Sequence, residues 1–259
     1  MPLFTLITGA SMGIGEAFVR EFAMQGHNLV LVARSVDKLQ LLAEELRRER
    51  GIQVEVCVMD LSENGAAESV YAFCCKRNIH VDVLVNCAGV SCAGSFVHIG
   101  LEKIEELVMV NMVATAKLTR LFVADMVSRK TGTLLNIASL GGLQGVPGLG
   151  LYSATKAFLI TLSEALAVEL QGKGVDIVVV CPGFIATTIF AHSGHNVKAI
   201  RLPLSKTDVV VKSTMIGLQK KQLRVFPTLL DRCLVFSQRF VSRKTAIRLA
   251  GFFAAVDKN

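Results

Sequence analysis

The sequence has no pattern of residues that indicates a metal site or a disulfide framework. Its seven cysteines, an odd number, lie mostly in apolar stretches, and Cys74 and Cys75 are adjacent without C-x-x-C spacing. None of the five histidines joins a cluster with metal-ligand spacing, since His192 and His195 have no carboxylate or cysteine companion. We therefore expect reduced core thiols and no bound metal.

Long uninterrupted apolar runs are also absent. No stretch of about eighteen apolar residues occurs, because charged residues or proline interrupt each candidate, as at Lys117, Asp125 and Pro182. The first apolar strand begins at Leu3, which leaves no room for a secretion signal ahead of folded sequence. These absences predict a cytoplasmic protein without membrane-spanning helices.

Acidic side chains are scarce towards the C-terminus. The formal net charge is +7, and residues 222–256 supply +5 of it, because Asp231 is their one acidic residue against six arginines and lysines. The remainder is nearly neutral, which argues against nucleic-acid binding. Apolar residues recur at helical spacing at about 228–256, which predicts two basic amphipathic helices. Such helices could lie on an anionic membrane, contact the phosphate-bearing carrier of an acyl chain, pack on the body of the protein or contact another subunit, and the sequence leaves these alternatives open.

No internal repeat or Pro/Gly/Ser-rich linker divides the chain, so we expect a single domain over residues 1–259 with an extension at 228–256. Apolar runs typical of buried strands alternate with helical patterns. The expected strands are 3–8, 28–33, 52–59, 81–86, 133–139 and 176–181, with a short seventh at 223–226. The expected helices are 14–25, 35–50, 64–77, 101–129 and 152–171. This alternation predicts an α/β fold, a doubly wound Rossmann-like parallel sheet of about seven strands with helices on both faces.

A glycine-rich turn joins the first expected strand to the first expected helix. It reads T-G-A-S-M-G-I-G from Thr8 to Gly15. Glycines allow a tight turn and a close approach of backbone to phosphate at a helix N-terminus, so this placement favours dinucleotide binding. The turn residues expected at the cofactor are Gly9, Ser11, Met12, Gly13, Ile14 and Gly15.

Tyr152 and Lys156 lie four residues apart in the last of the expected helices. This spacing puts a phenol and an ammonium on one helix face, where the cation would lower the pKa of Tyr152 from about 10 towards neutrality. An isolated Tyr-x-x-x-Lys match is more often an exposed helical pair. Here Ser139 stands thirteen positions upstream at a strand end, and Ser139 and Tyr152 together can bind an oxygen on which negative charge develops.

These motifs resemble the short-chain dehydrogenase/reductase family in its compact single-domain form, over residues 3 to about 190. The C-terminal region looks most like hydroxysteroid dehydrogenases and ketoacyl reductases. Further motifs of the family follow in order, namely Asp60-Leu61, Asn86-Cys87-Ala88-Gly89, Asn111, Pro182-Gly183 and Thr187.

The resemblance implies a role for each catalytic residue. Ser139 would hydrogen-bond the substrate oxygen and Tyr152 would transfer the proton. Lys156 would tune Tyr152 and hold the nicotinamide ribose, and Asn111 would hold a water that resupplies the proton.

The cofactor expected is NADP(H). Arg34 follows the second strand, where an acidic residue would bind a ribose 2′-hydroxyl, and its guanidinium suits a 2′-phosphate. The glycine turn has Ser11 and Met12 where many NADP-dependent relatives carry a basic residue. The resemblance further implies Asp60 and Leu61 at the adenine, Asn86, Ala88 and Gly89 at the ribose and nicotinamide, and Pro182, Gly183 and Thr187 at the carboxamide, besides Tyr152 and Lys156.

Residues 185–206 hold apolar side chains such as Phe190 and Leu202 among small polar ones, and we expect them to cover a pocket for an apolar substrate. The prediction is an NADP(H)-dependent oxidoreductase that interconverts a lipophilic ketone, such as a steroid or ketoacyl carbonyl, and its secondary alcohol. The alternative is a catalytically silent cofactor-binding regulatory or scaffold protein of the same fold. The resemblance also implies a homodimer or homotetramer, because helices 101–129 and 152–171 pair subunits in relatives.

Overall fold

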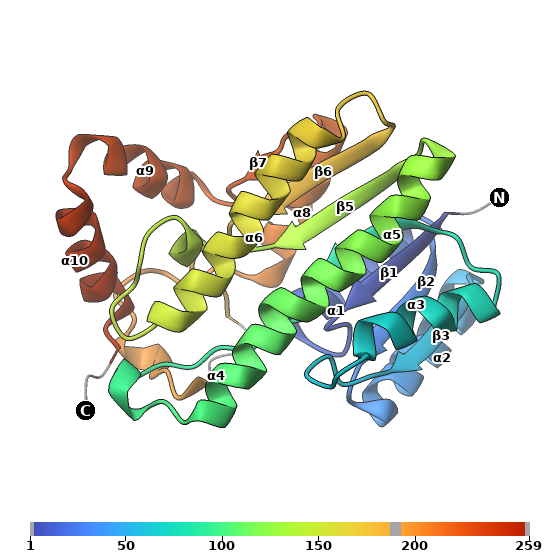
Figure 1. Ribbon diagram of the computed structural model, residues 1–259, viewed down its shortest axis with the longest axis horizontal. Coiled ribbons are helices and arrows are strands. Elements are labelled where there is room, and N and C mark those ends of the chain that lie inside the picture. Colours follow the sequence, from blue (N-terminus) through green and yellow to red (C-terminus); the bar gives the residue numbers. More distant parts are fainter. Residues whose placement is uncertain (1–2, 187–192, 257–259) are drawn as a thin grey trace.

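The computed structural model describes residues 3–186 and 193–256. Seven parallel strands form one sheet in the order β3-β2-β1-β4-β5-β6-β7 (Figure 1). The order reverses between β1 and β4, and the carboxyl ends of strands at such a point border a ligand-binding crevice in open α/β sheets. The predicted doubly wound sheet is confirmed. The strands are β1 (Phe4–Thr8), β2 (Asn28–Ala33), β3 (Val54–Val58), β4 (Val81–Asn86), β5 (Gly132–Ile137), β6 (Val175–Val180) and β7 (Arg224–Val225).

Helices cover both faces of the sheet. On one face pack α1 (Gly13–Met24), α2 (Val36–Arg50) and α8 (Thr207–Gln219), and on the other α3 (Ala66–Lys76), α5 (Thr115–Arg129) and α6 (Gly150–Glu169). Adjacent strand residues alternate between the two cores, so that Ile7 joins the first and Leu6 the second. Both cores are apolar, which explains why the strands read as continuous hydrophobic runs.

Helix α8 was not among the expected helices. Its buried positions are Val210, Val211, Thr214 and Gly217, and Met215 and Leu218 pack against the core beside them. Gly217 is small enough for Val225 of β7 to pack against it, since a Cβ there would meet the valine side chain. The helix is held by this apolar stripe and by the close contact of Gly217 with β7.

The expected helix at 101–129 changes its winding in the middle. It consists of α4 (Leu101–Val108), a π-helical segment η2 (Met109–Ala114) and α5. The Thr115 hydroxyl donates to the carbonyl of Val110, five residues earlier, at 3.4 Å. Single π-helical turns of this kind are frequent at functional sites, and Asn111 lies inside this one.

Two helical stretches, Leu101–Arg129 and Gly150–Glu169, are long and apolar enough to cross a membrane, judged on length and composition alone. Both pack against the sheet, and Leu118, Phe122 and Met126 of the first are buried in its core. These contacts are the ones that core helices make.

The two C-terminal helices predicted from the sequence are present as α9 (Leu229–Ser237) and α10 (Arg243–Ala254). Thr228 and Asp231 form a capping box at the start of α9, in which each side chain accepts a hydrogen bond from the other residue's backbone N–H. The Ser242 side chain likewise accepts from the N–H of Thr245 at the start of α10.

Both of these helices pack on the body of the protein, at the side opposite β3 (Figure 1). Gln238 donates to the side-chain oxygen of Gln144 at 2.8 Å, and Arg243 donates to the carbonyl of Leu143 at 2.9 Å. Packing on the body, one of the alternatives that the sequence left open, is therefore present on one side of these helices.

Four polar side chains form a buried cluster beside the centre of the sheet. Asn136 of β5 accepts from Asn86 of β4 at 2.9 Å and donates to Ser163 of α6 at 2.9 Å. Asn86 also donates to the hydroxyl of Thr119 in α5 at 3.1 Å. Because all four residues are buried, their hydrogen bonds have to offset the cost of removing polar groups from water. The cluster thereby ties two central strands to two helices of one layer.

We expect Asn136→Ala to lower the free energy of unfolding by roughly 2–4 kcal/mol, because it leaves buried partners unsatisfied and opens a small cavity. Chemical denaturation followed by circular dichroism measures the change. Asn64→Ala removes an exposed asparagine and is the matched control, with an expected change below about 0.5 kcal/mol. Equal losses in the two variants would contradict the role given to the cluster.

Candidate active site

A cavity of about 880 Å³ lies at the carboxyl ends of the strands, where the strand order reverses. Its walls are the glycine turn, the segments that follow β2 to β6, and the inner sides of α9 and α10. It brings together sixteen of the nineteen predicted site residues, namely Gly9, Ser11, Met12, Gly13, Ile14, Gly15, Arg34, Asp60, Leu61, Ala88, Gly89, Ser139, Tyr152, Lys156, Pro182 and Gly183.

The glycine turn is shaped so that only glycine fits at its key positions. Gly9 has φ +68° and its Cβ would lie 3.0 Å from the Ala88 backbone, and a Cβ on Gly15 would collide with the Gly9 carbonyl. The Thr8 hydroxyl accepts from the N–H groups of Cys87 and Ala88, both at 3.0 Å, which ties the turn to the end of β4. The residues of the first turn of α1, Gly13 to Gly15, line the cavity. A helix N-terminus of this kind fits the phosphates of a dinucleotide.

Arg34 and Asp60 stand at the same end of the cavity. Their side chains form an ion pair at 3.4 Å, and the Arg34 side chain is 62% exposed. Asp60 also accepts from the backbone N–H of Ser62 at 2.9 Å and from its hydroxyl at 2.7 Å. Burial raises the pKa of Asp60, but the bonds from Ser62 and the charge of Arg34 outweigh this and hold the pKa below its usual value. The carboxylate is thus an ionised acceptor beside a cation that is open to solvent.

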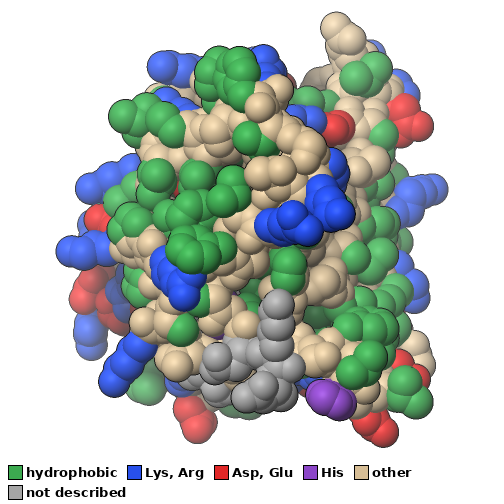
Figure 2. Space-filling view, turned by 90° about the vertical axis from the view of Figure 1, so that its left-hand side faces the viewer, with side chains coloured by type: hydrophobic (Ala, Val, Ile, Leu, Met, Phe, Trp, Pro, Cys, Tyr) green, Lys and Arg blue, Asp and Glu red, His purple; other side chains and the backbone are tan. Residues whose placement is uncertain are grey.

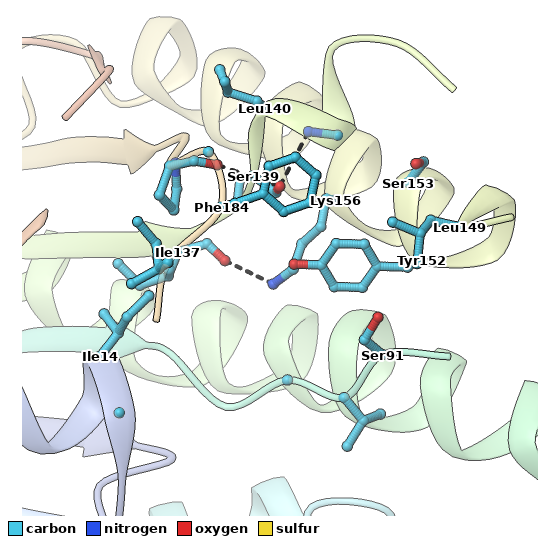
Figure 3. Close-up of a pocket in the computed structure, with 18 of the residues that line it drawn as sticks. Ile14, Ser91, Ile137, Ser139, Leu140, Leu149, Tyr152, Ser153, Lys156 and Phe184 are labelled. Atoms are coloured by element: carbon cyan, nitrogen blue, oxygen red, sulfur yellow. Dashed lines mark hydrogen bonds between the residues drawn. The ribbon is translucent and has the colours of Figure 1, made fainter. Parts of the chain in front are cut away.

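Ser139, Tyr152 and Lys156 meet at the other end. Figure 3 shows the Tyr152 ring and the Lys156 side chain pointing into the same part of the cavity, with Ser139 at the end of β5. The Lys156 ammonium donates to the carbonyl of Ile137 at 2.8 Å and lies 5.7 Å from the centroid of the Tyr152 ring. The Ser139 hydroxyl accepts from the N–H of Gly141 at 3.1 Å. One hydroxyl, one phenol and one ammonium therefore surround a single small region.

The expected lowering of the Tyr152 pKa is wrong in this structure. Burial raises the pKa of Tyr152 to about 12, and a hydrogen bond with Ser139 offsets only part of the rise. Burial also lowers the pKa of Lys156 to about 8. The reason is that helical spacing indicates proximity but not enclosure, and enclosure penalises the charged forms of both groups.

Asn111 lies beneath the cavity and does not line it. Its side chain is fully buried, accepts from the N–H of Val90 at 2.9 Å, and donates to the Val90 carbonyl at 2.9 Å and to Thr155 at 3.0 Å. A Cβ on Gly89 would lie 3.4 Å from both the Asn111 side-chain oxygen and the Lys156 ammonium. Asn111 therefore holds the strand-end segment at Val90 close to Lys156.

Asn86 does not lie where the resemblance places it. Its side chain belongs to the buried cluster with Asn136 and Thr119 and is not part of the cavity wall. The last residue of β4 points into the helical layer because side chains alternate along a strand. Thr187, expected at the nicotinamide, lies outside the described residues.

The sequence did not place the C-terminal helices at the site. Apolar side chains of α9 and α10 line the cavity, among them Leu234 and Phe253, together with Phe184 and with Leu202 from the expected cover segment. The amphipathic pattern at 228–256 signalled an apolar face, but a single sequence does not say what that face covers.

The chain contains only two tyrosines, and this allows a direct test of the Tyr152 pKa. Burial raises the pKa of Tyr152, and a hydrogen bond to Asp125 raises that of Tyr71, so the folded protein should form little tyrosinate up to about pH 11. The unfolded chain should titrate near 10, and the free energy of unfolding should fall above that pH because the unfolded chain releases protons that the folded one keeps. Ultraviolet absorbance of Tyr71→Phe isolates Tyr152, and a tyrosinate step near neutral pH would restore the expectation drawn from the sequence.

Comparison with known proteins agrees with this geometry. A family model described as short chain dehydrogenase matches residues 4–198. The very-long-chain 3-oxoacyl-CoA reductase of Anas platyrhynchos is 32% identical over 224 residues, which cover 84% of this chain and 70% of the relative. The 7beta-hydroxysteroid dehydrogenase of Collinsella aerofaciens is 34% identical over 182 residues, which cover 70% of this chain and 68% of the relative.

Solved structures show the same likeness. A short-chain dehydrogenase from Sphingobium yanoikuyae in complex with NADPH has a TM-score of 0.83 and 32% identity, over 93% of this chain and 96% of that one. A short-chain dehydrogenase/reductase from Burkholderia phymatum in complex with NAD shares the fold with a TM-score of 0.84, at 23% identity over 92% of this chain and 93% of that one. The family match and the agreement with these relatives in sequence and in fold establish that the chain belongs to the short-chain dehydrogenase family.

Proposed function

We propose that the protein is an NADP(H)-dependent oxidoreductase that interconverts a lipophilic ketone and its secondary alcohol. Membership of the short-chain dehydrogenase family supports the general part of this proposal, that the protein is an oxidoreductase acting on a ketone or alcohol. The observation that carries the proposal is the convergence of Ser139, Tyr152 and Lys156 in the cavity into which the glycine turn opens.

In this proposal the chain's own groups manage the oxygen and its proton. Ser139 and Tyr152 bind the carbonyl oxygen, and Tyr152 keeps its proton at neutral pH because burial raises its pKa to about 12, so it is ready to act as an acid. A bound dihydronicotinamide supplies the hydride to the carbonyl carbon. Lys156, held by the Ile137 carbonyl against the Tyr152 ring, stabilises the negative charge that develops on the phenol oxygen.

The remaining predicted roles are part of the same proposal. Asn111 holds Val90 close to Lys156 and supports the resupply of the proton. The glycine turn holds the phosphates of the cofactor. Gly183, in the segment that follows β6, lies against Asp231 of α9, so α9 packs directly on that segment.

A lipophilic substrate is supported by the wall of the cavity away from the glycine turn. Leu149, Phe184, Leu202, Leu234 and Phe253 line it. Burying an apolar substrate against such side chains is favourable in proportion to the area removed from water. The printed names of the two relatives, a 3-oxoacyl-CoA reductase and a hydroxysteroid dehydrogenase, support the same substrate class.

NADP is favoured over NAD by the residue that follows β2. Arg34 occupies the place where an acidic residue would select the free ribose hydroxyl, and its exposed guanidinium is available to a 2′-phosphate. Asp60 lies 3.4 Å away and orients the guanidinium from one side.

For its setting in the cell, we place the protein in the cytoplasm as a homodimer or homotetramer. Leu101 on α4 and Val168 on α6 are 73% and 72% exposed, which leaves an apolar side chain on each of the two helical stretches open to a subunit contact. The catalytically silent alternative has no support from the site, since all four catalytic side chains are present and placed together.

Tyr152→Phe tests the catalytic assignment. We expect NADPH to bind with nearly unchanged affinity while turnover falls by roughly a thousandfold or more, because the proton donor is removed and the cavity shape is kept. NADPH oxidation across a panel of apolar ketones and NADPH fluorescence titration give the two readouts. Tyr71→Phe, a tyrosine bonded to Asp125 away from the cavity, is the control and should retain turnover. If the wild-type protein oxidises no NADPH with any ketone of the panel, the silent alternative gains support.

Arg34→Ala tests the cofactor preference. We expect the Kd for NADPH to rise roughly 10–100-fold while the Kd for NADH hardly changes, because the charge-assisted contacts with a 2′-phosphate are lost. Nucleotide fluorescence titration measures both, with Arg48→Ala on the exposed far end of α2 as the control. Equal weakening of both nucleotides would mean that Arg34 does not read the 2′-position.

A further inference from the structure

The outer side of the C-terminal helices exposes many large apolar side chains. Of the nineteen large apolar residues that are exposed in the described chain, seven lie between 228 and 256. Three of the four exposed phenylalanines are among them, and Phe240 is 74% exposed. These seven residues, which we call the outer apolar set, are Leu229, Leu230, Phe236, Phe240, Val241, Leu249 and Phe252.

Among the described residues of this segment, the same surface carries positive charge that no exposed acidic side chain compensates. Five basic residues of this segment are exposed, namely Arg232, Arg239, Arg243, Lys244 and Arg248. Its one acidic residue, Asp231, is buried and engaged in the capping box of α9. Figure 2 shows hydrophobic and basic side chains side by side on this face of the molecule, with the acidic ones mainly towards its margins.

The inner side of the same helices is the wall of the cavity. Leu234 of α9 and Ala246, Ala250 and Phe253 of α10 line it. The helices are held in place by the bond from Arg243 to the Leu143 carbonyl and by the bond between the His195 ring and the Ala254 carbonyl. One helix pair thus separates the substrate region from the surroundings.

Three members of the outer apolar set also line the cavity. Leu230 is 37% exposed, Val241 38% and Leu249 44%, and all three contribute to the cavity wall. A residue that both lines a cavity and reaches solvent stands at its rim. The opening next to α9 and α10 is therefore framed by apolar side chains and lies on the basic apolar face.

We propose that this face docks on an anionic lipid bilayer and that the lipophilic substrate enters the cavity from the bilayer between Leu230, Val241 and Leu249. Exposed aromatic and aliphatic side chains enter the interfacial region of a bilayer, and basic residues are attracted to anionic headgroups. The proposal has two halves: docking on the bilayer, the docking half, and entry of the substrate from it, the substrate half. The substrate half rests on the proposed function, whereas the docking half is argued from the exposed apolar and basic side chains alone.

The charge pattern selects this partner over a second copy of the chain. A twofold contact through this face would set five cations against five cations, which is unfavourable without acidic partners. A bilayer supplies negative charge and an apolar interior together, which matches both components of the surface.

Vesicle flotation of the full chain tests the docking half. We expect binding to vesicles of phosphatidylcholine with phosphatidylserine, weak binding to phosphatidylcholine alone, and a loss of binding at high salt. The combined change Arg239→Gln, Lys244→Gln and Arg248→Gln should weaken binding by roughly 100-fold, because each basic residue near the surface contributes separately. None of the three lines the cavity.

Matched controls remove the same charge and the same apolar area elsewhere. Lys38→Gln with Arg48→Gln and Arg50→Gln removes three exposed cations from α2 and should leave binding unchanged. Leu229→Ser with Phe240→Ser should weaken binding, whereas Leu41→Ser with Val97→Ser, residues of similar exposure, should not. A wild type that ignores anionic vesicles, or controls that lose as much as the C-terminal variants, would overturn the proposal. So would C-terminal variants that change only the oligomeric state in sedimentation, since the face would then be a subunit interface.

The entry route has a separate readout. When a long-chain ketone is held in anionic vesicles, the triple charge variant should reduce it at a rate at least roughly tenfold lower than that of the wild type. Both proteins should reduce a short water-soluble ketone at equal rates. Equal rates on the vesicle-held ketone would refute entry from the bilayer. If the wild type reduces neither ketone, the proposed function fails, and vesicle binding still decides the docking half.

Discussion

The enclosure of the Lys156 ammonium is the constraint on which the arrangement of the site depends. The residue is 4% exposed, and its charge is held by the carbonyl of Ile137. A buried cation without such an acceptor would be strongly destabilising, so α6 has to meet the end of β5 at this point. Gly142 makes the approach possible, because a Cβ there would lie 2.7 Å from the Lys156 backbone. The same docking carries Tyr152, one turn earlier on α6, to Ser139.

The parts of the molecule that follow local patterns could be predicted from the sequence. The strands are recognisable because both of their faces are buried, and the glycine turn because strand, turn and helix are adjacent in the chain. Tyr152 and Lys156 share a helix face at a spacing that fixes their proximity. The four-residue spacing carries no information on enclosure, however, and enclosure is what sets the pKa of both groups.

What could not be predicted depends on partners distant in the sequence. Asn86 turns away from the cavity to bond Asn136, fifty residues later, and a motif match does not report that direction. The close contact of Gly217 in α8 with Val225 of β7 adds to the apolar packing of that helix, and spacing in the sequence does not show it. The C-terminal helices are held at the wall of the cavity by contacts with Leu143, Gln144 and His195, all distant from them in the sequence.

The match to the family ends at residue 198, whereas the helices that roof the cavity begin at Leu229. In the proposed function, the groups that handle the proton and the groups that shape the substrate space thus belong to different stretches of the chain. A change within α9 or α10 is then expected to alter the fit of a substrate more than the geometry of Ser139, Tyr152 and Lys156, because the sheet and α6 hold those residues. The chain is in this sense modular, so substrate choice can diverge during evolution, or be exchanged by grafting a C-terminal segment, while the reaction chemistry is inherited unchanged.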